Sequence, residues 1–184
     1  MRRFTLSSLV LFAILAATAA TAHAQAAPSV DDQIRSALSA APAEVAEHAT
    51  VALADGTILR KGSNDWVCLP DMPDVPNNAP MCLDANWREV MDAFMNQREP
   101  VFVGTGFSYM LQGDMPVSNT DPYATSPTED NQWIPAGGPH IMVVFSDPAM
   151  LEGISTDPDN GGPFVMWKGT PYAHVMIPTA PRRP

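Results

Sequence analysis

The stretches GPHIMVVF, residues 138–145, and PYAHVMIP, residues 171–178, decide the fold prediction. Each is a short apolar run bounded by glycine or proline, which is typical of a buried strand. Each also carries a histidine followed two residues later by a methionine: His140 with Met142, and His174 with Met176. Successive side chains of a strand point to opposite faces, so each His-x-Met pair lies on one face. We predict that the two strands lie close together and that both imidazoles point to the same side.

The first 24 residues have the pattern of a signal peptide. Arg2 and Arg3 form a basic start, residues 9–20 are almost wholly apolar, and residues 22–24 form a cleavage site of the A-x-A type. The segment is too short and wrongly flanked for a membrane anchor. We therefore expect residues 25–184 to form a single exported domain, periplasmic or secreted, without integral membrane association.

The expected mature chain is strongly acidic. All 20 acidic residues follow the cleavage site, whereas two of the 10 basic residues precede it, which leaves a formal net charge of 8 − 20 = −12. Such a surface repels the phosphates of nucleic acids and of anionic membranes. Nucleic acid is therefore excluded as a partner, and solubility is the simplest explanation of the charge.

Two cysteines, Cys68 and Cys82, are the only ones in the chain. In an oxidising compartment a lone pair predicts a disulfide. The residues between them include prolines 70, 73, 76 and 80, which exclude a helix or a central strand there. We expect a stiff cross-linked loop, worth about 3 kcal/mol in the chain-entropy model of disulfide stabilisation.

The other elements are predicted from local patterns. Ser29 and Asp32 form a capping box before a short helix, and Asp55-Gly56 between apolar runs predicts a hairpin. A second helix is predicted to begin with a capping box at Asn86 and Glu89. Its apolar face has helical spacing and comprises Trp87, Val90, Met91, Phe94 and Met95.

This order of elements gives the fold class α+β, with a mainly antiparallel sheet packed against one or two helices in a single domain. Residues 112–138 form a long polar connection rich in proline, aspartate and asparagine. A connection of that length is usually functional or disordered. Because it contains Tyr123, Trp133 and Ile134, we expect it to be ordered and to cover a site.

Several sequence segments resemble those of an uncharacterised family of exported bacterial proteins: NDWVCLPDM, PMCLD, SNTDPYA, GPHIMV and PFVMWKGTPYAHVM. The resemblance covers most of the mature chain and implies that residues 64–177 form one unit. It brings no activity and no catalytic residues with it.

The paired His-x-Met strands predict a metal site, because imidazole binds several transition metals and thioether selects copper(I). The proposed ligands are His140, Met142, His174 and Met176, with copper or zinc as the ion. Oxygen ligands for a harder ion could come from Asp114, Asp121, Glu129 or Asp130. The alternative is that both methionines fill the core and both histidines bond to backbone carbonyls.

A site without metal is the second interpretation. His140 or His174 would act as acid or base, with Asp121 as the carboxylate that orients the imidazole. An aromatic pocket for a small apolar ligand would be formed by Tyr123, Trp133, Trp167 and Tyr172.

Three functions remain open at this point. The leading hypothesis is an exported binding module for a small molecule or soft metal ion, with its site on the His/Met strand face under residues 112–138. The second is a small extracytoplasmic hydrolase or isomerase that uses His140 or His174. The third is a structural envelope protein.

Overall fold

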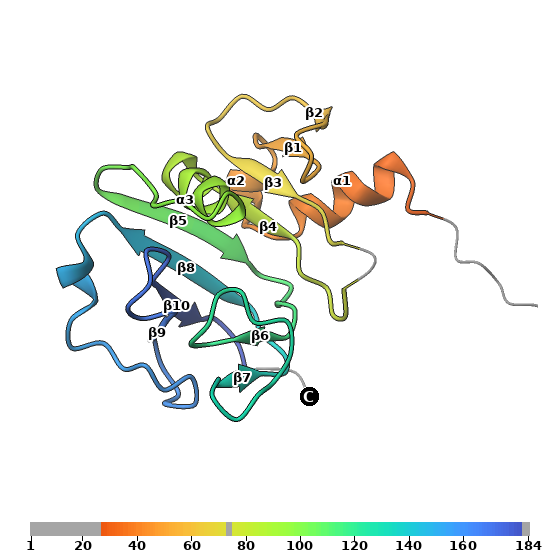
Figure 1. The fold of residues 1–184 in the computed structure, drawn as a ribbon. Coiled ribbons are helices and arrows are strands. Elements are labelled where there is room, and N and C mark those ends of the chain that lie inside the picture. The colour runs from red at the N-terminus through yellow and green to blue at the C-terminus, as the bar shows by residue number, and fades with distance from the viewer. Residues whose placement is uncertain (1–26, 73–74, 182–184) are drawn as a thin grey trace, which may run out of the picture.

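The computed structural model describes residues 27–72 and 75–181, and the predicted signal peptide lies outside them. An eight-stranded sheet, in the order β2-β1-β3-β4-β5-β8-β10-β9, runs through the whole domain (Figure 1). Among the strand pairs of this sheet in the described residues, only β1–β3 is parallel. The structure therefore agrees with an α+β fold built on a mainly antiparallel sheet.

The strands of the sheet are β1 Thr50–Ala52, β2 Ile58–Arg60, β3 Val67–Leu69, β4 Met81–Leu83, β5 Thr105–Met110, β8 His140–Phe145, β9 Phe164–Met166 and β10 His174–Pro178. A separate two-stranded sheet pairs β6 Val117–Ser118 with β7 Trp133–Ile134. The helices are α1 Val30–Leu38, α2 Ala43–Ala46, α3 Ala85–Met95 and the 3-10 helix η1 Pro148–Leu151.

The two faces of the sheet are covered by different segments. Leu83 of β4 packs in one cluster with α3 residues, whereas its neighbour Cys82 packs in another cluster with α1 residues. Because adjacent residues of a strand point to opposite faces, α3 and α1 lie on opposite sides of the sheet. The α1 side of β8, β9 and β10 is covered by η1 through Leu151.

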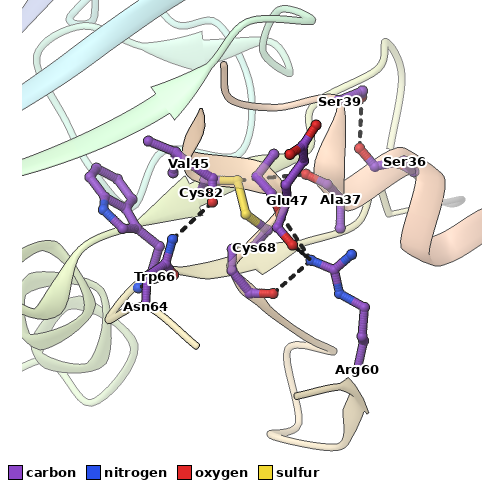
Figure 2. The surroundings of a disulfide bond; sticks show 12 residues. Ser36, Ala37, Ser39, Val45, Glu47, Arg60, Asn64, Trp66, Cys68 and Cys82 are labelled. Atoms are coloured by element: carbon purple, nitrogen blue, oxygen red, sulfur yellow. Dashed lines mark hydrogen bonds between the residues drawn. A yellow bond between two sulfur atoms is a disulfide. The ribbon is translucent and has the colours of Figure 1, made fainter. Parts of the chain in front are cut away.

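The disulfide Cys68–Cys82 is present, as predicted, and joins directly opposed positions of β3 and β4. Both cysteines are fully buried beneath α1. Figure 2 shows how polar groups fix the neighbouring turn: the Arg60 guanidinium donates to the carbonyls of Ala46 and Ala49, and the Asn64 amide donates to that of Val45. The cross-link ties β3 to β4, and the hydrogen bonds tie β2 and the turn before β3 to α2 and the residue Ala49.

Two predictions for the N-terminal part, a helix cap and a hairpin, are confirmed. The capping box between Ser29 and Asp32 begins α1. The Asp55-Gly56 hairpin joins β1 to β2, and Gly56 has a φ of 85°, a left-handed conformation that glycine adopts without strain.

The prediction for α3 is right in its main face and wrong at both ends. The helix is capped by Asp84, whose Oδ1 accepts from Trp87 N–H, while Glu89 bonds Arg98 instead of closing a capping box. Met95 is 71% exposed. At about 100° per residue, Met95 points roughly 140° away from Val90, which is on the buried face.

Residues 112–138 are ordered around the β6–β7 sheet, which Figure 1 shows beside the start of β8. A bridge between Asp114 and Gly137 closes the base of this segment. Gly137 is needed there, because a Cβ at this position would come 2.4 Å from the Asp114 Cβ.

The edge strand β9 is not free. The N–H of Val165 donates to the carbonyl of Ser155, and the N–H of Trp167, the first residue after the strand, donates to the carbonyl of Asn119. Two loops therefore cover this edge of the sheet. No helix within the described ranges 27–72 and 75–181 is long and apolar enough to cross a membrane.

Candidate functional site

The two His-x-Met strands are neighbours, as predicted. Strands β8 and β10 pair antiparallel, with Met142 opposite Met176 and His140 opposite Pro178. His174 precedes Val175, whose partner is Val143. Both histidines therefore share the face that Met142 and Met176 present to α3, but they lie four residues apart along the ladder. At about 3.3 Å per residue their Cα atoms are roughly 13 Å apart along the strands.

His174 lies in the core beneath α3. Its ring makes edge contacts with Trp87 and Trp167, each at 5.1 Å between centroids, and the residue is 1% exposed. Its Nδ1 donates to the carbonyl of Tyr172 at 2.9 Å. Burial lowers the pKa of His174 to about 4, against the smaller opposing effect of the Tyr172 hydrogen bond. His174 is thus a neutral packing residue at pH 7.

His140 lies at the other end of the strand pair, beneath residues 112–138. Its Nδ1 is 2.7 Å from the carbonyl oxygen of Gly138, so Nδ1 must be the protonated donor. His140 is 3% exposed, and its Nε2, like that of His174, has no hydrogen-bond partner in the part of the chain that the structure describes; of the two, only His140 lines a pocket. A buried nitrogen without a partner is costly, which marks His140 as a residue that needs an explanation.

A pocket of about 30 Å³ lies against His140. A single water molecule needs about 10–15 Å³ of such space, so the pocket accepts only a very small ligand. It is lined mainly by apolar side chains and backbone, and its titratable lining residues are Asp114 and His140. The whole lining comprises Asp114, Val117, Ile134, Gly137, Gly138, His140, Phe164, Met166, Met176, Pro178 and Ala180.

Asp114 brings a carboxyl group to this pocket. The residue is partly buried, and its Oδ1 accepts from the N–H of Met115 at 2.7 Å. Burial raises the pKa of the Asp114 carboxyl, and the nearby His140 partly offsets that rise. Asp114 was only one of four possible oxygen ligands by sequence, because its approach to His140 depends on the distant bridge to Gly137.

Asp121, the carboxylate predicted to orient an imidazole, has another role in the structure. It is exposed, and its Oδ1 accepts from the N–H of Tyr123 two residues later. This is a local turn in which an aspartate side chain replaces a backbone acceptor. The carboxylate that lines the pocket with His140 is Asp114.

Three of the four predicted aromatic residues come together around a residue that was assigned only to the core. Phe94 of α3 stacks between Tyr123 and Trp167, at centroid distances of 5.1 and 5.5 Å, and meets Tyr172 edge-on. Trp133 is not among these ring contacts; it lies in β7 opposite Ser118. The rings fill the space between α3 and residues 112–138, so they form packing rather than the wall of the small pocket.

The part of the chain that the structure describes has no metal cluster of the usual kind. Among residues 27–72 and 75–181, no group of three or more histidine, cysteine, aspartate or glutamate side chains could hold a metal ion. Any ion at His140 would therefore need ligands of another kind, such as the methionine thioethers that line the same pocket.

Comparison with known proteins adds no relative: no family model matches the chain, and no curated protein or solved structure gives a significant match.

Proposed function

We propose that the chain is an exported binding module whose site is the pocket at His140. Its ligand is a soft metal ion or a molecule of very few atoms. The observation that carries the proposal is the buried Nε2 of His140, which has no partner within the described residues and belongs to a side chain that lines a pocket. The cross-linked domain and the predicted signal peptide support export.

The hydrogen bond of His140 explains how the imidazole would bind. Because Nδ1–H donates to the Gly138 carbonyl, the neutral ring has its lone pair on Nε2. A backbone carbonyl that fixes the ring in this way is the usual second partner of a histidine that binds metal. The same lone pair would accept a hydrogen bond from a small molecule. The ring orientation is set before any ligand enters.

The test follows the imidazole nitrogens of His140 and His174 by NMR in histidine-labelled protein. Copper(I), zinc and a library of small neutral molecules are added one at a time, and the metal content of protein from its native compartment is measured in parallel. We expect one probe to shift the His140 Nε2 resonance and to leave His174 unchanged. The proposal is wrong if His140→Gln binds every probe as tightly as the wild type.

A small hydrolase or isomerase is the second candidate, because Asp114 gives His140 a carboxyl group in the same pocket. If Nε2 of His140 acts as the acid or base, replacing His140 should lower kcat/KM by about 10²–10⁴-fold. His140→Gln and Asp114→Asn would then both abolish turnover of small esters, whereas His174→Gln would keep it. Equal turnover by wild type and His140→Gln would exclude this candidate.

A further inference from the structure

Thioether groups line the same pocket as His140. Met176 of β10 and Met166 of β9 both contribute to its wall. Met176 lies two residues from Pro178, the register partner of His140, so it is the nearer of the two along the sheet. Leucine or isoleucine would fill such a wall equally well, whereas methionine adds a soft electron-pair donor.

We propose that the pocket is a copper(I) site in which His140 Nε2 and the Met176 thioether are the direct ligands and the Asp114 carboxylate balances the charge. This inference rests on the proposed function and names its ligand. Met142 is not a ligand here, although it pairs with Met176, because it does not line the pocket.

The choice of copper(I) follows from the donor set. Zinc sites need several nitrogen, oxygen or thiolate ligands in tetrahedral geometry, and the described residues contain no group of three such side chains. Copper(I) is satisfied by few ligands and prefers thioether and imidazole. The pocket offers one imidazole and thioethers, and its small volume suits a bare ion better than a hydrated one.

Asp114 supplies a second, independent argument. An isolated carboxylate is unfavourable when it is removed from water, and so is an isolated cation. Asp114 is partly buried and lines the same pocket as His140, and its Oδ1 accepts a hydrogen bond from the N–H of Met115. A monovalent cation between Asp114 and His140 would satisfy both the carboxylate and the unpartnered Nε2.

The experiment measures copper(I) affinity of the purified exported protein in competition with a chromophoric copper(I) chelator. The decisive variant is Met176→Leu, which removes the sulfur and conserves the volume. Met142→Leu is the matched control, because it makes the same change directly opposite on the same face. Loss of a group that hydrogen-bonds to a metal ligand typically costs about 10–100-fold in metal affinity. Loss of a direct ligand should therefore cost at least about 100-fold.

We expect Met176→Leu and His140→Gln to bind copper(I) at least 100-fold more weakly and Met142→Leu to bind as the wild type does. X-ray absorption of the copper-loaded wild type should show a copper–sulfur distance, a reading that does not depend on how well a variant folds. Wild-type affinity in Met176→Leu, equal weakening in both leucine variants, or no sulfur scattering would each overturn the inference. If His140→Gln still abolished binding of zinc or of a small molecule, the proposed function would stand without copper.

Discussion

The two His-x-Met strands have the same spacing and share one face of the sheet, yet their histidines lie in different surroundings. His174 is enclosed by the rings of Trp87 and Trp167 and belongs to the core under α3. His140 lies under residues 112–138, beside a pocket and a carboxyl group. Both donate Nδ1–H to the carbonyl two residues earlier. The difference between the two histidines therefore comes from the segment that packs over each strand end. A repeated motif identifies a site only when the segment that packs over it is also known.

The largest effect is expected at the His174 end. Trp87 is 4% exposed and packs on both His174 and the sheet, so Trp87→Ala should lower the free energy of unfolding by about 3–5 kcal/mol. Denaturant unfolding followed by circular dichroism measures this. A loss below about 1 kcal/mol would mean that α3 does not seal the core over His174.

A pH titration of stability tests whether His174 is buried and neutral. Its folded pKa is about 4, below the ordinary value of 6.5, so the unfolded chain takes up the proton first as the pH falls. Stability should therefore fall by up to about 3 kcal/mol between pH 6.5 and pH 4, and the contribution should stay constant below that range.

The control for this titration is His174→Gln, which has no titrating group at that position. The raised pKa of Asp114 acts with the opposite sign, because that carboxyl favours the folded state when protonated. The difference between wild type and His174→Gln removes this contribution, since Asp114 is present in both proteins. A difference that does not change with pH would show that the His174 end admits water.

A smaller effect is expected where the His140 end depends on backbone contact. In Gly137→Ala the new Cβ would meet the Asp114 Cβ at 2.4 Å, so the base of the 112–138 segment must shift. Overpacking of this kind costs about 1–3 kcal/mol. Gly153→Ala is an unsuitable control because Gly153 has a positive φ, whereas Gly162→Ala is suitable because its Cβ would meet only the Asn160 side chain at 3.6 Å. Thermal unfolding of both variants would show whether the bridge to Asp114 is rigid.

The smallest effect is expected at the aromatic cluster beside His174, whose ring contacts Trp167. The hydroxyl of Tyr123 lies 3.0 Å from that of Tyr172 and 3.1 Å from the carbonyl of Phe94. Tyr123→Phe keeps the stacked ring and removes these hydrogen bonds, for a cost of about 0.5–1.5 kcal/mol. Unchanged ligand binding at His140 in this variant would confirm that the cluster only packs. A loss of binding would show that the aromatic cluster and the pocket at His140 belong to one site.

The parts of the fold that depend on near neighbours in the chain were predictable. The capping box at Ser29, the Asp55-Gly56 hairpin and the Cys68–Cys82 bond each follow from a short pattern or a lone pair. The pairing of β8 with β10 was predictable because two apolar runs with the same motif have few places in a small sheet.

The rest depends on contacts between distant residues. Nothing near Asp114 in the sequence indicates that its bridge to Gly137 brings a carboxyl group to His140. The position of Phe94 between Tyr123 and Trp167 likewise depends on how residues 112–138 fold over α3. Asp84 replaced the predicted cap because its second oxygen also accepts from Phe107 of β5, a tertiary contact that local patterns do not encode.

The covered edge at β9 has a consequence for how this sheet meets other proteins. An exposed edge strand is a template for pairing with another chain, and proteins commonly blunt or cover it. At β9 an incoming strand would first have to break the bonds of Val165 and Trp167 to the two covering loops. At β2, the other edge, the strand has three residues and Ile58 is 54% exposed. Growth of the sheet into a larger assembly would therefore begin at β2, and the short length of that strand limits how many bonds a second chain can gain.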